Sequence, residues 1–308
     1  MRLCCAIERE TGRFIDIAEL AVHSTPRKLA GRLFGEGSEQ RQTIVRLNSG
    51  PEHTKIFFLS GHAWNPNSLR RIAAHLEDTA AVVSVLPPPL DEARRVLRDS
   101  RVTAEYALKQ IRAHQPSGPY HLFGYSYGGI IAVEIARALR AAGQALGTLM
   151  LLDSYISSGD EIYKPMWRRA FIHARQISKG GPTLLSKRIR ERNRRMRAPA
   201  GMPPQYEKAG RLFEEAEAAC AHAFAHYYPE SYSGDLLLLR CREQLDHEQF
   251  TRELPLGGWP RFVTGRVTVE KIAGNHFSVL KDPHAAGVAR QVRKYLLASR
   301  GALASATG

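Results

Sequence analysis

Short apolar runs rich in β-forming residues alternate along this chain with longer segments of helical pattern, and no other feature restricts the fold as much. The runs that predict strands span 55–60, 81–86, 120–124, 148–153, 235–240 and 266–272. Apolar positions spaced three and four residues apart predict helices over 67–78, 101–114, 129–141 and 284–298. A chain of 308 residues is long enough to bury a full core of this kind. The alternation predicts an α/β fold, in which helices cover both faces of a mostly parallel central sheet.

The alternation stops after the strand predicted at 148–153. Residues 155–228 contain helical pattern, polar loops and interruptions such as GGPT and APAGMPP, without a strand-like run. A segment of this length is more typical of a functional insertion than of an ordinary loop. We therefore expect one domain over 46–300 that carries a helical lid at about 155–228, followed by a flexible tail at 301–308.

A serine between glycines follows the strand predicted at 120–124. The segment HLFGYSYGGI places Gly124, Ser126 and Gly128 where this strand gives way to the next helix. G-x-S-x-G at such a junction is typical of a nucleophile elbow, a strained turn that lifts the serine hydroxyl off the sheet. Glycines are expected on both sides because side chains there would collide with neighbouring backbone. The alternative is a tight turn with an inert serine.

A serine hydroxyl is a weak nucleophile at neutral pH, so catalysis requires a base and an acid that orients the base. Several of the twelve histidines fall on helices or in polar surroundings, where packing or solvation explains them: His75, His114, His222 and His226. His276 differs, because its loop AGNHFSVL follows the last predicted strand. That loop would place the imidazole at the carboxyl edge of the sheet beside Ser126. A loop histidine that caps local backbone is the alternative.

Two places along the chain supply a candidate acid. Asp153 closes the apolar run TLMLLD, and a carboxylate at that strand end reaches the same edge as the serine and the histidine. Glu243 and Asp246 follow the next strand, in RCREQLDH. All three give the chain order serine, acid, histidine, so order does not choose between them. Asp153 also has the alternative interpretation of an Asx turn at the entrance of the lid.

Basic residues outnumber acidic ones and give the chain a formal net charge of +14. Seven basic residues surround a single Glu191 in KRIRERNRRMR, at 187–197. This run predicts either an electrostatic patch for an acidic partner or a solvated helix face. It contains no aromatic residue, and the chain has no recognisable nucleic-acid fold signature, so we expect no specific binding of nucleic acid.

The four cysteines and the distribution of apolar residues indicate the cellular compartment. Cys4, Cys5, Cys220 and Cys241 form neither a disulfide framework nor a metal-binding spacing, so no metal is expected. No apolar stretch reaches the roughly 20 residues that cross a bilayer, and the N-terminus lacks the pattern of an export signal. We expect a cytoplasmic protein that does not interact with membranes.

The chain from about Arg46 to Leu297 resembles the thioesterase domains of nonribosomal peptide and polyketide synthases. The similar stretches are AEYALKQIRAHQPSGPYHLFGYSYGGIIAVEIARAL, LMLLDS, YSGDLLLLRCREQ, the GW at 258–259 and VEKIAGNHFSVLKDPH. The resemblance implies an α/β-hydrolase fold with a helical lid, and it assigns the acid to Asp153.

The same resemblance implies an oxyanion hole built from two backbone N–H groups. The matching positions are Tyr127, directly after the serine, and His62, in the loop after the first core strand. Here the sequence departs from the family, because His62, Ala63 and Trp64 replace a small, glycine-rich stretch. The departure leaves the second donor uncertain by one residue and puts Trp64 where it would narrow the pocket.

Residues 1–45 resemble the final part of a carrier domain, in MRLCCAIERETGRFIDIAELAVHSTPRKLAGRL. The resemblance implies a helix, a short acidic and apolar helix, and a last helix introduced by HSTPRKLA, with the attachment serine upstream of Met1. An ordinary amphipathic extension is the alternative. A carrier-like segment favours a terminal offloading thioesterase over a freestanding editing thioesterase.

These features predict a serine thioesterase that releases an acyl or peptidyl chain from the phosphopantetheine of a carrier, by hydrolysis or cyclisation through an acyl-serine intermediate. The expected partner is an acyl or peptidyl carrier domain, in cis or in trans, and the hydrolase domain itself is expected to bind no cofactor. Carrier domains tend to be acidic, so the basic run at 187–197 is a candidate docking site. The alternatives are another serine esterase or acyltransferase of the same fold, and a noncatalytic scaffold with a degenerate site.

Overall fold

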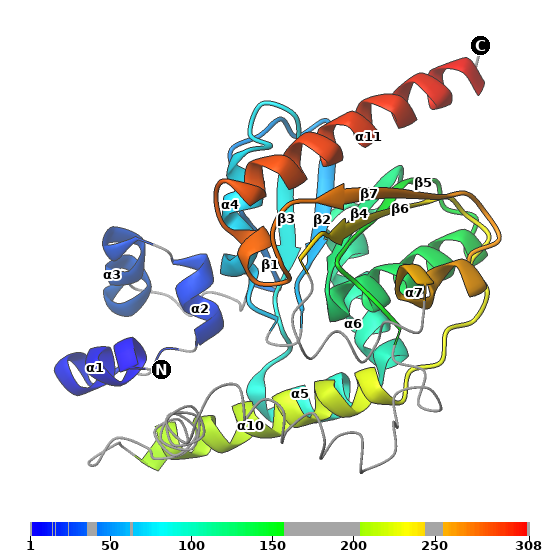
Figure 1. Ribbon diagram of the computed structural model, residues 1–308. Coiled ribbons are helices and arrows are strands. Elements are labelled where there is room, and N and C mark those ends of the chain that lie inside the picture. The colour runs from blue at the N-terminus through cyan, green and yellow to red at the C-terminus, as the bar shows by residue number, and fades with distance from the viewer. Residues whose placement is uncertain are drawn as a thin grey trace, which may run out of the picture.

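The computed structural model describes residues 2–13, 15, 17–23, 25–35, 42–61, 64–156, 204–243 and 255–306. Within these residues the centre is a seven-stranded sheet of order β1-β3-β2-β4-β5-β6-β7 (Figure 1). The strands are β1 (Ile44–Arg46), β2 (Lys55–Leu59), β3 (Ala81–Val85), β4 (Tyr120–Tyr125), β5 (Leu146–Leu152), β6 (Leu236–Cys241) and β7 (Val267–Ile272). Of these described strands, only β1 runs antiparallel to its neighbour. The prediction of a mostly parallel α/β sheet is confirmed.

Helices cover both faces of this sheet (Figure 1). One face carries α4 (Arg70–Ala74) and α11 (His284–Ala306), and the other carries α5 (Leu90–Leu97), α6 (Ser100–His114) and α7 (Tyr127–Ala141). In β2, Phe57 and Leu59 pack in the cluster that contains α5 to α7, whereas Ile56 and Phe58 pack in the cluster that contains α4 and α11. Because both faces are buried, the strands are apolar almost throughout, which made them recognisable in the sequence.

Several elements differ from the sequence-based prediction. The helix predicted at 67–78 is a short 3-10 helix, η1 (Pro66–Leu69), followed by α4, which ends at Ala74. A tertiary contact lies directly after this early end: Arg293 of α11 donates to the main-chain oxygen of His75 at 3.0 Å. The short β1 and α5 were not predicted, because neither spans enough residues to show a clear period. In contrast, α11 continues through much of the segment expected as a tail.

The last part of the expected lid is a long helix, α10 (Pro204–Ala225), which packs on α5. Small side chains form its buried face, so the two helices approach closely: Ala216, Ala219, Cys220 and Ala223. Just beyond its end, Tyr227 donates a 2.6 Å hydrogen bond to the buried carboxylate of Glu134 in α7. The basic run at 187–197 lies outside the described residues.

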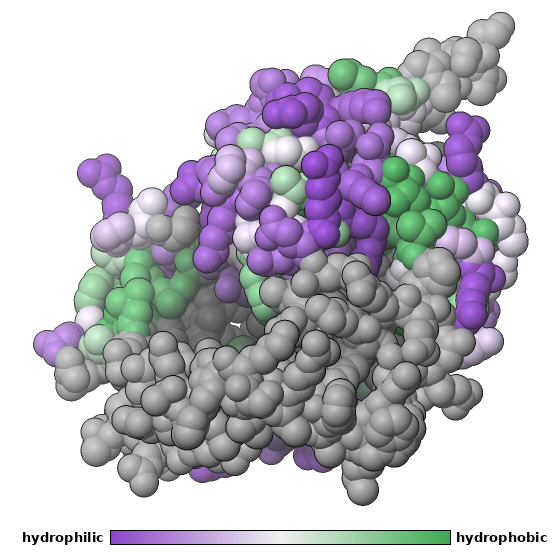
Figure 2. Space-filling model, in the orientation of Figure 1, coloured by the Kyte–Doolittle hydropathy of each residue, from purple (hydrophilic) through white to green (hydrophobic). Residues whose placement is uncertain are grey.

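Three helices precede the sheet among the described residues: α1 (Arg2–Thr11), α2 (Ile17–Val22) and α3 (Pro26–Phe34). The Thr25 side chain caps the first turn of α3, which fixes where that helix begins. Ile15 and Leu33 are buried in a small cluster of their own. Figure 2 shows hydrophobic surface over these helices, where Leu3 and Phe34 are exposed.

A helix has to be long and apolar to span a bilayer. Among the described segments, none is both long enough and apolar enough to cross a membrane.

Candidate active site

Ser126 stands in the sharp turn between β4 and α7. Its backbone has φ 55° and ψ −125°, a conformation that costs a residue with a side chain on the order of 1–3 kcal/mol. The Ser126 N–H donates to the main-chain oxygen of Leu152 in β5 at 3.0 Å, and the Ser126 carbonyl accepts the N–H of Gly129 at 3.0 Å. These bonds hold the strained turn between the edge of the sheet and the first turn of α7.

Three glycines make room for this turn. A Cβ at Gly124 would lie 2.4 Å from the main-chain oxygen of Gly128, and a Cβ at Gly128 would lie 2.2 Å from the main-chain oxygen of Leu59. A Cβ at Gly129 would lie 2.3 Å from Ser154 Oγ. The G-x-S-x-G pattern includes the first two glycines but not Gly129, so the third requirement is visible only in the structure.

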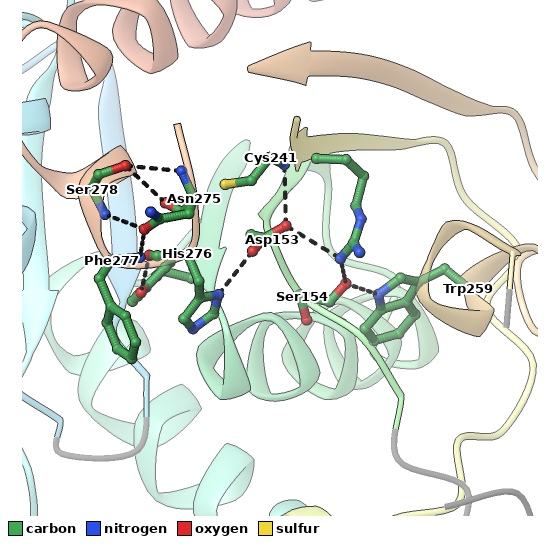
Figure 3. Close-up of polar contacts among 10 residues, drawn as sticks. Asp153, Ser154, Cys241, Trp259, Asn275, His276, Phe277 and Ser278 are labelled. Atoms are coloured by element: carbon green, nitrogen blue, oxygen red, sulfur yellow. Dashed lines mark hydrogen bonds and ion pairs between the residues drawn. The ribbon is translucent and has the colours of Figure 1, made fainter. Parts of the chain in front are cut away.

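Asp153 and His276 are hydrogen bonded to each other at the carboxyl edge of the sheet (Figure 3). The distance from His276 Nδ1 to Asp153 Oδ2 is 2.8 Å, and both side chains are buried. Asp153 follows β5 with φ 44°, a left-handed conformation that Asp adopts more readily than most residues. Of the rival acids, Glu243 is exposed and Asp246 lies outside the described residues.

The other carboxylate oxygen of Asp153, Oδ1, faces the end of β6. It accepts the Cys241 N–H at 3.1 Å and lies 3.3 Å from Arg240 Nη1. Burial is the largest single influence on this carboxyl and opposes its ionisation, but the His276 hydrogen bond, the Arg240 charge and the Cys241 N–H together hold the pKa of Asp153 below its ordinary value. An ionised acceptor at Oδ2 makes Nδ1 the donor of the imidazole, so Nε2 is its proton acceptor.

Short-range hydrogen bonds shape the loop that carries His276 (Figure 3). Asn275 Oδ1 accepts the N–H groups of Phe277 at 3.1 Å and Ser278 at 2.9 Å, while Ser278 Oγ accepts the Asn275 N–H at 2.8 Å. Gly274 enters the loop with φ 92°, which a residue with a side chain rarely adopts. The GNHFS sequence therefore specifies an Asx-type turn, and its Asn is a signal in the sequence that indicates such a turn.

Tyr125 connects the elbow with the histidine. Its ring stacks on the His276 imidazole with the ring centroids 4.9 Å apart, and its hydroxyl donates to the main-chain oxygen of His276 at 2.6 Å. Because Ser126 directly follows Tyr125, these contacts bring the serine turn and the histidine loop together. The elbow pattern treats position 125 as variable, so sequence reasoning did not single it out.

Tyr127 and the loop after β2 flank the serine. Tyr127 is the first residue of α7, so its N–H lies at the positive end of the helix dipole. A Cβ at Gly61 would lie 3.2 Å from Ser126 Cβ, which shows that the loop begins against the serine. His62 lies outside the described residues. Trp64 is only 3 % exposed, and it packs within the apolar core.

The chemistry available here is that of a hydroxyl, an imidazole and a carboxylate. Within the part of the chain that the structure describes, no three side chains of His, Cys, Asp or Glu gather as a metal site. Cys220 and Cys241 are buried, and burial raises the pKa of Cys220 to about 12. The Cys220 thiol is therefore a poor nucleophile at neutral pH.

Comparison with known proteins places this chain in a family. Residues 66–296 match the family model described as Thioesterase domain. The chain is 29 % identical over 174 residues to vanchrobactin synthetase VabF of Vibrio anguillarum and 32 % identical over 161 residues to enterobactin synthase component F of Escherichia coli O157:H7. These stretches cover 54 % and 50 % of this chain but 6 % and 12 % of the two relatives, so the chain spans a small part of their length.

Two solved structures resemble most of the chain. The NocB thioesterase domain, in covalent complex with a fluorophosphonate nocardicin G analog, superposes with a TM-score of 0.58 at 21 % identity, over 83 % of this chain and 100 % of that one. The type II thioesterase BorB from the borrelidin biosynthetic cluster gives 0.57 at 17 % identity, over 84 % and 98 %. This likeness shows that the fold is the α/β-hydrolase fold expected from the sequence. Since the family model matches well over half of the chain, the chain belongs to the thioesterase domain family.

Proposed function

We propose that the chain releases an acyl or peptidyl group from the phosphopantetheine thiol of a carrier domain, through an ester formed on Ser126. The observation that carries this proposal is the hydrogen-bonded pair of Asp153 and His276, at the edge of the sheet where a strained elbow presents the serine. The thioesterase family and the synthetases among the relatives support a carrier-bound thioester as the substrate.

In the first half-reaction, Ser126 Oγ attacks the carbonyl carbon of the thioester while His276 Nε2 accepts the hydroxyl proton. The C–S bond then breaks, and the protonated imidazole returns the proton to the leaving sulfur, so that the carrier departs as a free thiol. Asp153 holds the imidazole in the correct tautomer and stabilises its charged form. The Tyr127 N–H is the proposed donor to the oxyanion, because it lies at the positive end of α7.

In the second half-reaction, a nucleophile with a transferable proton attacks the Ser126 ester. His276 removes that proton and passes it to Ser126 Oγ as the ester bond breaks. With water the product is a free acid, and with an amine or hydroxyl of the same acyl chain the product is a ring. Carriers in cis and in trans are both compatible with this chemistry.

A fluorophosphonate probe tests the nucleophile without any assumption about the acyl group. Such probes phosphonylate an activated serine, so the native chain is expected to gain one probe mass on the peptide that contains Ser126. Ser126→Ala is expected to gain none, whereas Ser117→Ala, which removes an exposed serine before β4, is expected to label as the native chain does. Unchanged labelling of Ser126→Ala would overturn the assignment of the nucleophile.

A rate comparison tests the substrate class. An acyl group is offered either on a phosphopantetheinylated carrier or as a simple p-nitrophenyl ester, at matched concentration. The proposal predicts faster turnover of the carrier thioester, because remote contacts of the carrier and its arm contribute to transition-state binding. A preference for the simple ester would favour a general esterase of the same fold.

A further inference from the structure

The strand β6 has the sequence LLLLRC, in which one cation interrupts an otherwise apolar run. Leu236 and Leu238 pack on one face of the sheet, whereas Leu237 and Leu239 pack on the other. Because side chains alternate along a strand, Arg240 continues the face of Leu236 and Leu238 at the point where the strand ends. Its side chain is only 17 % exposed, so a charge stands in a position that the neighbouring pattern would fill with an apolar residue.

Within the described part of the chain, the guanidinium of Arg240 makes two polar contacts, both with the turn that carries the acid. Its Nη1 lies 3.3 Å from Asp153 Oδ1 and 3.5 Å from the main-chain oxygen of Ser154. The carboxylate is thereby divided between two sets of partners. Oδ2 accepts from His276, while Oδ1 faces Arg240 and the Cys241 N–H.

The second contact of Arg240 is shared with Trp259. The indole N–H of Trp259 donates to the same Ser154 oxygen at 3.1 Å (Figure 3), and the Trp259 side chain is fully buried. The Ile156 N–H also donates to the main-chain oxygen of Gly257 at 2.8 Å. The turn after β5 is therefore tied to β6 and to η3 (Pro255–Arg261) at once, which fixes the carboxylate relative to the end of β6.

We propose that Arg240 is a positioning residue of the hydrolytic site, which orients the Asp153 carboxylate toward His276 and partly offsets its charge. This inference rests on the proposed roles of Ser126, Asp153 and His276. A guanidinium group is a permanent cation in proteins, so the arginine side chain acts as a fixed charge. It works through Asp153 and has no contact with the reacting atoms.

The loss of the Arg240 charge would have an electrostatic effect of definite direction on the His276 imidazole. The Asp153 carboxylate faces the imidazole from the end of β5, Arg240 of β6 lies behind this carboxylate, and the uncharged Tyr125 hydroxyl of β4 binds the main-chain oxygen of His276. Without Arg240, less of the carboxylate charge would be offset, and a protonated His276 would become more favourable. The base would then lose its proton at a higher pH, so the acidic limb of the pH–rate profile would move upward.

A purely structural role makes a different prediction. If Arg240 only satisfies the Ser154 carbonyl and fills space, its loss would lower stability and the amount of active protein. It would leave the position of the acidic limb unchanged. The pH profile therefore separates the two roles.

The experiment measures the second-order rate constant of fluorophosphonate labelling against pH for three variants and the native chain. Arg240→Met removes the charge and Arg240→Lys keeps it without the planar fork. Arg242→Met is the matched control, because Arg242 is exposed two residues further along the same strand end. Far-ultraviolet circular dichroism and thermal melting report the folding of each variant.

For Arg240→Met we expect labelling about tenfold slower at the optimum, since the orientation of the acid is disturbed, and an acidic limb shifted upward by on the order of half a pH unit. Arg240→Lys should restore the limb and only part of the rate, and Arg242→Met should match the native profile. A native rate in Arg240→Met, or a slower rate with an unmoved limb, overturns the proposal. If Arg240→Met does not fold, Arg240→Gln takes its place, with the same expected rate and limb shift and the same two results that overturn the proposal.

The labelling assay contains no carrier and no thioester. If the proposed substrate class is wrong, the serine still labels and the role of Arg240 is still tested. If the proposed nucleophile is wrong, labelling of Ser126 is absent from the native chain itself. The two failures are therefore distinguishable.

Discussion

Replacing Gly128 by alanine is expected to destabilise the fold and to slow the reaction of the serine. The added Cβ would lie 2.2 Å from the main-chain oxygen of Leu59 and 2.6 Å from that of Ser60. The first oxygen belongs to the last residue of β2 and the second to the residue directly after it, and β2 is hydrogen bonded to β3 and to β4. No side chain can rotate away, so the elbow or the strand end has to move by on the order of 1 Å in a close-packed interior.

The size of the effect follows from that displacement. Overpacking of a rigid site costs about 3 kcal/mol of unfolding free energy, at the upper end of the usual range, because the obstacle is backbone. A misplacement of about 1 Å at a catalytic group slows a reaction roughly 100-fold. Urea denaturation followed by tryptophan fluorescence measures the first quantity, and the rate of fluorophosphonate labelling measures the second.

Gly287→Ala is the matched control for this substitution. Gly287 lies in α11, and its added Cβ would meet nothing within 4 Å. Because alanine restricts the unfolded chain and favours helix, this variant should gain roughly 0.5–1 kcal/mol of unfolding free energy and label at the native rate. Native stability and native labelling of Gly128→Ala would refute the reasoning, since the close approach to β2 would then impose no constraint.

Three further substitutions probe the contacts around the site and the end of the segment expected as a lid. Asp153→Asn should lower the labelling rate by roughly 10⁴-fold, because it favours the wrong histidine tautomer. The pKa of Asp153 is lowered in the folded state. In urea titrations the native chain should therefore lose more unfolding free energy than this variant as the pH falls below about 4. Tyr125→Phe keeps the ring stack on His276 but removes a 2.6 Å hydrogen bond, so unfolding free energy should fall by about 1 kcal/mol and labelling should slow several-fold, whereas equal values would deny the contact any role. Tyr227→Phe leaves the buried Glu134 carboxylate without its 2.6 Å donor and should cost about 1–3 kcal/mol in the same denaturation assay, whereas Tyr228→Phe, at an exposed position, should cost nothing measurable.

The sheet and the candidate residues of the site were accessible from the sequence because each depends on a local pattern. Strands buried on both faces are continuous apolar runs, and the elbow is marked by glycines that flank Ser126. Asp153 and His276 stand directly after predicted strands, and parallel strands bring their carboxyl ends to one edge. The choice of Asp153 over its rivals still required a family resemblance, because chain order was the same for all three.

Other features depend on contacts between distant segments, which no local pattern encodes. Arg240 and Trp259 meet at the carbonyl of Ser154, 86 and 105 residues away in sequence. Tyr125 contacts a residue 151 positions further along the chain. The early end of α4 coincides with the contact that Arg293 makes from α11. In each case tertiary packing decides what periodicity cannot show.

The central claim, an acyl group carried on Ser126, is tested most directly by rapid-quench mass spectrometry. A carrier loaded with an acyl thioester is mixed with the native chain, quenched within one turnover and digested. The account predicts that the peptide containing Ser126 gains the acyl mass, that this species decays at the turnover rate, and that Ser126→Ala neither gains the mass nor turns the substrate over. Turnover of the thioester by Ser126→Ala at the native rate, with no acyl mass on the peptide of the native chain, would contradict it.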